Sequence, residues 1–277
     1  MFRKGWTVAP VVLAALGSLT LATGQETGQA GGKTNGLPKE IAADLGGGVK
    51  MEMVLIPAGE FMMGSPDSDR SAANDEKPQH RVRITQAFYL GKYPVTQEQW
   101  TAVMGENPSH FKGPKNPVEW VSWEDCQRFL TRLNEKPGLG KWQFPTEAQW
   151  EYACRAGSTT IFCFGNDESG LDEYGWYDKT SGGKPHPVGE KKPNAWGLYD
   201  MNGSIWQWCL DWYDPGYYAH SPTNDPTGPA TGTERVSHGG SWASPARSAR
   251  SANHGRIEAG HHGTHLGFRA ALAPAEP

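Results

Sequence analysis

The chain has 277 residues, with 26 Lys and Arg against 30 Asp and Glu, which gives a formal net charge of -4 at pH 7. A general nucleic-acid surface shows a basic excess, so this balance argues against a nucleic-acid partner. The 35 Gly, 21 Pro and 12 Trp, with only 37% hydrophobic residues, are typical of a loop-rich fold whose turns are clamped by aromatic side chains. We expect one domain after Met51, since no polar linker divides that region.

The N-terminus has the features of an export signal. Two basic residues precede an apolar run from Val8 to Leu21, and small residues follow it. The run contains a Pro and a Gly and is shorter than the about 20 apolar residues of a membrane span. We therefore predict a cleaved signal peptide over 1–24, a flexible tether rich in Gly, Thr, Ala and Gln over 25–48, and a domain over 49–273. The mature protein is then secreted or periplasmic, with no transmembrane span.

The first part of the domain is predicted to form β-strands. Apolar or alternating runs bounded by turn residues indicate strands over 53–57, 61–64, 81–84 and 88–90. The polar segment 66–80 between the second and third runs is predicted to be a surface excursion.

Three helices are predicted next, each from a capping residue. They begin after Thr96, Ser122 and Thr146, and the first and third have a Gln at the capping-box position. One face of the second helix is apolar at helical spacing and carries Cys126, Phe129, Leu130 and Leu133. We interpret the acids of the third helix, Glu147 and Glu151, as complements of the helix dipole rather than as a catalytic pair.

The four cysteines have two open interpretations. An exported chain enters an oxidising compartment, where Cys126, Cys154, Cys163 and Cys209 could form disulfides in any of three pairings. Buried free thiols are the alternative, because two of these residues fall on predicted helices beside apolar neighbours.

The C-terminal segment from Arg235 to Arg269 is framed by glycines and holds little that could build a core. Glycines at its ends permit the dihedral angles with which a loop leaves a sheet, and polar side chains between rigid anchors often bind ligands. We predict a displayed ligand-binding surface that includes Trp242, Ser244, Arg247, Ser248, Arg250, Asn253, His254, Arg256 and His262. Its arginines favour a protein or glycan partner that is anionic or hydroxylated.

Three motifs resemble the formylglycine-generating enzyme, or sulfatase-modifying-factor, family. The segment reads Arg-Val-Ser-His-Gly-Gly-Ser-Trp over 235–242 and Leu-Gly-Phe-Arg over 266–269, and similar motifs lie at 144–153 and 194–201. The likeness runs from about Met53 to Arg269. It implies a single α+β domain of the formylglycine-generating-enzyme type, C-type-lectin-like and rich in irregular loops, a fold that also serves as a binding scaffold.

The resemblance also implies where the family's chemistry lies. Its enzymes oxidise a substrate cysteine to formylglycine with copper held by two cysteines, which align with Ser244 and Ala249 here. Because soft thiolates suit Cu(I) and no cysteine follows Cys209, we expect neither copper nor a catalytic residue of that kind. The leading hypothesis is a ligand- or partner-binding scaffold. The alternative is an oxidoreductase that acts on sulfatase cysteines, or another substrate, through a rebuilt metal site.

Two metal sites are considered. The family's structural calcium motif survives as Gly203, Ile205 and Gln207 without its carboxylate, so we expect a weakened calcium site. A transition-metal site could draw on several residues near the C-terminus, although histidines in glycine-rich loops are usually only polar. These residues are His238, His254, Glu258, His261, His262 and His265.

Overall fold

The computed structural model describes residues 36–136 and 140–274. The predicted signal peptide over 1–24 and the first part of the predicted tether, 25–35, lie outside these ranges. The helices are α1 (Gln97–Met104), α2 (Trp123–Asn134), α3 (Glu147–Arg155) and α4 (Leu171–Tyr174). The strands are β1 (Glu40–Gly46), β2 (Val49–Ile56), β3 (Gly59–Met63), β4 (His80–Ile84), β5 (Phe88–Gly91), β6 (Gly140–Gln143), β7 (Trp206–Trp212), β8 (Glu234–His238), β9 (His254–Glu258), β10 (Leu266–Phe268) and β11 (Ala271–Pro274).

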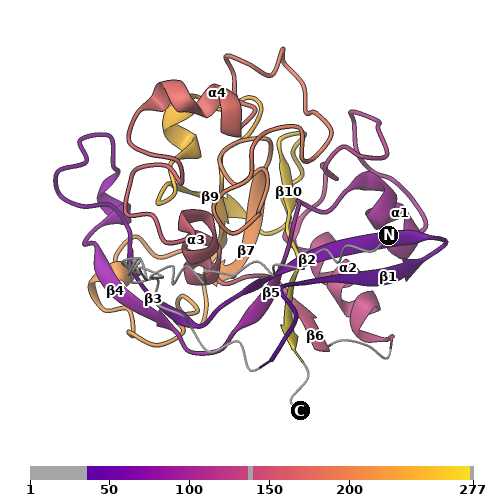
Figure 1. Cartoon of the computed structure of the whole chain (residues 1–277), viewed down its shortest axis with the longest axis horizontal. Helices are drawn as coiled ribbons and strands as arrows, with labels where there is room; N and C mark the ends of the chain where they lie inside the picture. The colour runs from indigo at the N-terminus through magenta and orange to yellow at the C-terminus, as the bar shows by residue number, and fades with distance from the viewer. Residues whose placement is uncertain (1–35, 137–139, 275–277) are drawn as a thin grey trace, which may run out of the picture. The chain divides into compact units, whose positions relative to one another are not determined.

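The strands form three sheets (Figure 1). An antiparallel five-stranded sheet has the order β1-β2-β5-β11-β6, so the last strand of the chain lies between β5 and β6. A four-stranded sheet has the order β10-β7-β8-β9, with β10 parallel to β7. The β3-β4 hairpin forms the third sheet. This mixture of helices, curled sheets and long loops confirms the expected α+β fold.

The five-stranded sheet is buried on both faces. In β2, Met53 and Leu55 pack into one apolar cluster with α1 and α2, whereas Val54 and Ile56 pack into a second with α3 and β4. Successive residues of a strand point to opposite faces, so an uninterrupted apolar run is what a doubly covered strand requires.

The three predicted helices are confirmed with their caps. Thr96, Ser122 and Thr146 each accept a hydrogen bond from the third backbone N–H of the helix that follows. The four predicted apolar residues of α2 are all buried. The third helix ends at Arg155, because Ala156 adopts a left-handed φ of 47°.

The tether prediction is wrong for its last part. Residues 40–46 form β1, which pairs with β2 at the edge of the central sheet. Ala43 and Leu45 are buried and alternate with exposed residues. This alternation is typical of a strand, but the Gly- and Ala-rich composition of the segment does not reveal it.

Two glycines fix the ends of the C-terminal segment. Gly240 has a φ of 70°, and a Cβ there would lie 2.9 Å from the carbonyl oxygen of Ser248. Gly267 has no left-handed dihedral, but a Cβ would come within 2.3 Å of the Val118 carbonyl oxygen. The first glycine is therefore needed for its dihedral angles and for space, and the second for space alone.

All four cysteines are free thiols, which agrees with the second interpretation. Cys126, Cys154 and Cys209 are buried, and burial raises the pKa of the Cys154 thiol to about 12. Within the described ranges, no helix has the length and apolar character to cross a membrane.

Candidate functional site

The C-terminal segment is only partly a displayed surface. Arg247, Arg256 and His262 are exposed, as expected. Arg250 is not, since only 3% of its surface is accessible, and its neighbours Ala249 and Ser251 are buried as well. The prediction that Arg250 lies on a ligand-binding surface is therefore wrong.

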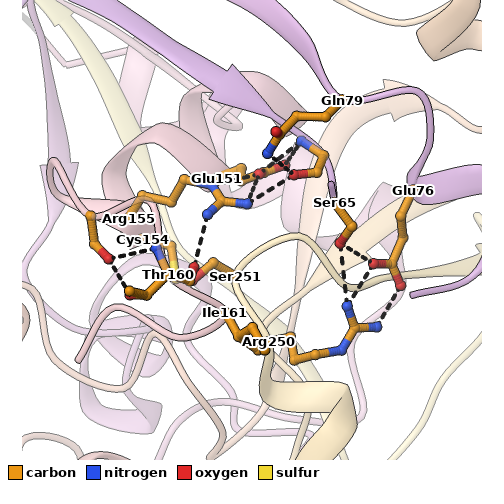
Figure 2. A network of polar contacts seen from close by, with 12 residues as sticks. Ser65, Glu76, Gln79, Glu151, Cys154, Arg155, Thr160, Ile161, Arg250 and Ser251 are labelled. Atoms are coloured by element: carbon orange, nitrogen blue, oxygen red, sulfur yellow. Dashed lines mark hydrogen bonds and ion pairs between the residues drawn. The ribbon is translucent and has the colours of Figure 1, made fainter. Parts of the chain in front are cut away.

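Arg250 is buried because it has carboxylate partners far away in the sequence. Its guanidinium donates to both oxygens of Glu76, at 2.6 and 2.7 Å (Figure 2). It also donates to Asp69, at 3.2 Å. Asn253, another predicted ligand-binding residue, also donates to Glu76, at 3.1 Å. Burial alone would raise the pKa of Glu76, but hydrogen bonds from Arg250 and its charge hold that pKa below the ordinary value. These contacts hold the C-terminal segment against the loop between β3 and β4.

A second buried ion pair corrects the interpretation of Glu151. Its carboxylate accepts from Arg155 at 2.7 Å and from the backbone N–H of Gly64 at 3.0 Å (Figure 2). The Glu151 side chain is 0% exposed. A helix-dipole role does not explain that burial, and the residue instead holds α3 against the end of β3.

Ser244 and Ala249, where the resemblance places the family's copper cysteines, have structural contacts. The Ser244 hydroxyl lies 2.8 Å from the Ser241 hydroxyl and accepts from the indole N–H of Trp206 at 3.2 Å. Ala249 is 1% exposed and its carbonyl accepts from Asn202 at 2.7 Å. Neither side chain offers a thiolate.

Three other predicted ligand-binding residues, Trp242, Ser248 and Arg256, lie within or against the domain in different ways. The indole N–H of Trp242 donates to the Thr264 carbonyl at 3.0 Å, and Ser248 is half-buried in the short 3-10 turn after Pro245. The Arg256 guanidinium lies over the Tyr213 ring at 5.0 Å. Arg256 is the one of these three that is exposed.

The calcium motif lies at the start of β7. The amide oxygen of Gln207 accepts two hydrogen bonds, from Trp150 and from Arg269, both at 2.9 Å. Its amide nitrogen donates to the Asp200 carbonyl at 2.9 Å. The Gly203 carbonyl, which lies before Ile205, accepts from the Ile205 N–H at 3.1 Å. The Gln207 oxygen, the strongest neutral candidate ligand, is thus already paired twice.

The cluster with the most distinctive chemistry combines one carboxylate and two histidines from three elements. Glu147 is the first residue of α3, His238 the last of β8 and His254 the first of β9. Glu147 Oε1 lies 3.4 Å from His238 Nε2 and 3.0 Å from His254 Nδ1. The β8-β9 pairing places the two histidines directly opposite each other. The three ligand atoms lie within 4.8 Å of one another.

This group, which we call the Glu147–His238–His254 triad, is buried and has further polar neighbours. Its side chains are 6%, 0% and 4% exposed. The Tyr218 hydroxyl donates to Glu147 Oε1 at 2.8 Å, and His254 Nε2 lies 3.6 Å from Asp75 Oδ2.

Charge pairing within the triad shifts its ionisation. Burial disfavours the charged form of each group, yet the charge of His254 and hydrogen bonds from both rings hold the pKa of Glu147 below its ordinary value. Conversely, burial alone would lower the pKa of His254, but Glu147 and Asp75 raise it to about 10. Asp211, whose carboxylate accepts the Glu147 N–H at 2.8 Å, has a raised pKa because it is buried beside that negative charge.

The sequence indicates two residues of the triad, His238 and His254, as candidate metal ligands. The carboxylate that it indicates is Glu258, which is exposed in the structure. An acid at the first position of a helix has an ordinary explanation, so its pattern could not reveal Glu147. The rings of His261 and His265 flank Gly263, which brings those two together without a helix.

A groove of about 350 Å³ lies beside His262. Its lining includes Trp120, Asp125, Arg128, Arg132 and His262. Trp120 has a left-handed φ of 62° and is 47% exposed. The His262 ring lies 2.9 Å from Asp125 Oδ2 and 6.5 Å from the Trp120 ring. A bulky residue in a left-handed conformation is uncommon and often marks a functional position.

Comparisons with known proteins agree with the motifs. A family model described as "Sulfatase-modifying factor enzyme 1-like domain" matches residues 46–274. The chaperone protein LppX of Paenibacillus barcinonensis is 30% identical over 270 residues, covering 80% of this chain and 89% of that protein. The formylglycine-generating enzyme of Streptomyces coelicolor is 28% identical over 263 residues, covering 68% of this chain and 78% of the enzyme.

Among solved structures, Treponema denticola variable protein 1 superposes with a TM-score of 0.76 at 31% identity, covering 86% of this chain and 100% of that chain. The family model covers most of the described residues, and a related solved structure has the same fold. The chain belongs to the sulfatase-modifying-factor family.

Proposed function

We propose that this is an exported protein that uses the sulfatase-modifying-factor fold as a ligand- or partner-binding scaffold. The observation that carries the proposal is that no cysteine follows Cys209, so Ser244 and Ala249 stand where the motif resemblance leads us to expect the family's copper cysteines. The relative LppX is named a chaperone protein, so a partner-binding role has a precedent among similar chains.

The groove beside His262 is the favoured binding position. Trp120 presents a broad apolar ring, and Arg128, Arg132 and His262 add cationic or hydrogen-bonding groups around it. Arg128 and His262 share Asp125 as a partner. Aromatic faces stack on sugar rings and on planar groups, and guanidinium groups pair with carboxylate or sulfate. The groove therefore suits a hydroxylated ligand that carries an anionic substituent, such as an acidic or sulfated glycan. Exposed Arg247 and Arg256 extend the cationic character of the C-terminal segment.

The binding test uses a sulfated glycosaminoglycan oligosaccharide as the probe, with isothermal titration calorimetry as the readout. Trp120→Ala and Arg128→Ala are each expected to weaken binding by at least about tenfold, which corresponds to about 1.4 kcal/mol. Met62→Ala is the matched control, because Met62 is another large exposed hydrophobic residue, at 44%, on a different element. Equal binding by the wild type and both groove variants would contradict the assignment of the groove.

An oxidoreductase with a rebuilt metal site is the second candidate. The observation in its favour is the Glu147–His238–His254 triad, which offers ligands that transition metals accept. Its burial counts against catalysis at the triad, since side chains that are at most 6% exposed leave little access for a substrate cysteine. A sulfatase partner belongs to this second candidate alone.

The weakened calcium site remains a prediction. Because Gln207 Oε1 already accepts two hydrogen bonds, coordination there requires one of them to break. We expect millimolar Ca²⁺ to leave the melting temperature within about 1 °C of its value in EDTA, since binding raises stability only when ligand exceeds Kd. A saturable rise at micromolar Ca²⁺ would show that the site is intact.

A further inference from the structure

We propose that the Glu147–His238–His254 triad is a structural binding site for one divalent transition-metal ion of the Zn²⁺ class. This inference goes beyond the binding function and does not depend on it. The three residues are 91 and 16 positions apart in sequence, as read from 147, 238 and 254, and they meet because α3 abuts the ends of two paired strands.

The separations match those of ligands around a small ion. Zinc binds imidazole nitrogen and carboxylate oxygen at about 2.0–2.1 Å in a tetrahedral arrangement, which separates neighbouring ligand atoms by about 3.3–3.4 Å. The His238–Glu147 and His254–Glu147 distances are 3.4 and 3.0 Å. The third pair lies within 4.8 Å, so side-chain motion, together with release of the proton that His254 shares with Glu147, would bring all three atoms to one centre.

The surroundings also resemble those of metal-binding histidines. Such residues usually direct their second ring nitrogen towards a carboxylate, which fixes the ring and raises its basicity. His254 presents Nδ1 to Glu147, and its Nε2 lies 3.6 Å from Asp75 Oδ2, slightly beyond hydrogen-bond distance. Asp75 is held in turn by the Tyr213 hydroxyl at 2.6 Å. The position of His238 is equally fixed, because its ring stacks on Trp150 with centroids 4.7 Å apart.

Ligand count and burial indicate a structural ion. Three protein ligands leave a fourth position, and the Tyr218 hydroxyl lies close to two of the ligand atoms, 2.8 Å from Glu147 Oε1 and 3.5 Å from His254 Nδ1. All the ligands are almost completely buried, so an ion there would cross-link α3, β8 and β9. Nitrogen and carboxylate ligands without thiolate favour Zn²⁺ and Co²⁺ over Cu(I).

The test titrates untagged, chelator-treated protein with Zn²⁺ by calorimetry and with Co²⁺ by visible absorption. We expect one equivalent to bind, with a four-coordinate Co²⁺ spectrum that lacks thiolate charge transfer. At 100-fold excess of Zn²⁺ over Kd, we expect the melting temperature to rise by roughly 5–10 °C. No saturable one-equivalent binding, or a thiolate spectrum, would overturn the proposal.

Variants then separate metal binding from hydrogen bonding. His238→Gln and His254→Asn keep a polar group near Glu147 but remove the imidazole, so each is expected to weaken Zn²⁺ binding by at least about 100-fold. His220→Ala, which removes an exposed histidine, is expected to bind Zn²⁺ like the wild type. Wild-type affinity in both triad variants, or loss of binding only in His220→Ala, would refute the site. If the triad variants do not fold, the wild-type stoichiometry and Co²⁺ spectrum still decide.

Discussion

Replacing Arg250 by Ala should destabilise the domain severely. The substitution removes the bidentate partner of Glu76 and the nearest cation to Asp69, whose side chains are only 1% and 6% exposed. Two buried carboxylates would then lack a cation and would keep only neutral hydrogen-bond donors, such as Ser65 and Asn253 for Glu76 and Ser71 for Asp69. Removing one partner of a buried ion pair typically costs about 3–5 kcal/mol, because the other charge is left desolvated.

The expected loss is measurable by thermal and denaturant unfolding. For a domain of this size, about 3–5 kcal/mol lowers the melting temperature by roughly 6–20 °C. Arg247→Ala is the matched control: Arg247 is exposed, so its removal should change stability by no more than about 0.5 kcal/mol.

The pH dependence provides an independent check on the same ion pair. Against the effect of burial, hydrogen bonds from Arg250 and its charge lower the folded pKa of Glu76 below its unfolded value. Hydrogen bonds from Ser71, followed by the charge of Arg250, do the same for the pKa of Asp69. Stability from these groups is therefore present above the unfolded pKa of about 4 and is lost as pH falls through the lower folded values. If Arg250→Ala unfolds within about 1 kcal/mol of the wild type at pH 7, the argument from the buried ion pair is refuted.

Three further predictions concern single side chains. Burial raises the folded pKa of Asp200 to about 6, so its stability contribution is present below the unfolded pKa of about 4 and is lost as pH rises through 6. Asp200→Asn should accordingly raise the free energy of unfolding in urea by about 2–3 kcal/mol at pH 8 but change it little at pH 4. An equal effect at both pH values would contradict the raised pKa of Asp200. Ser122→Ala removes the N-cap of α2 and should cost about 1 kcal/mol in the same assay, whereas Ser122→Asp should restore most of it. Gly240→Ala should cost more than about 1 kcal/mol, since its φ is 70° and a Cβ would lie 2.9 Å from the Ser248 carbonyl; an unchanged melting temperature would contradict that prediction.

The sequence predicted the fold well where local chemistry decides the structure. Thr96, Ser122 and Thr146 predict helix starts because the side chain of a capping residue accepts a hydrogen bond from a backbone N–H of the turn that follows it. Strand β1 was missed because its pairing with β2 is a tertiary contact, and its two buried residues, Ala43 and Leu45, stand among glycines and charged residues.

The candidate site was harder to predict because its residues meet only in three dimensions. Arg250 looks like a surface arginine until Glu76, 174 positions earlier, is seen to pair with it. Likewise, Glu147 has a sufficient local explanation at a helix N-terminus, and only the packing of α3 against β8 and β9 brings it to His238 and His254. Long-range electrostatic pairing leaves no periodic signal in a single sequence.

The central claim is that the fold is used here for binding and not for cysteine oxidation by copper. The most direct test incubates the mature, copper-loaded chain aerobically with a sulfatase-motif peptide that contains cysteine, and follows the peptide by mass spectrometry. The formylglycine-generating enzyme of Streptomyces coelicolor serves as the positive control. We predict that the peptide mass stays unchanged with this chain while the control converts it; formation of formylglycine by this chain would contradict the account.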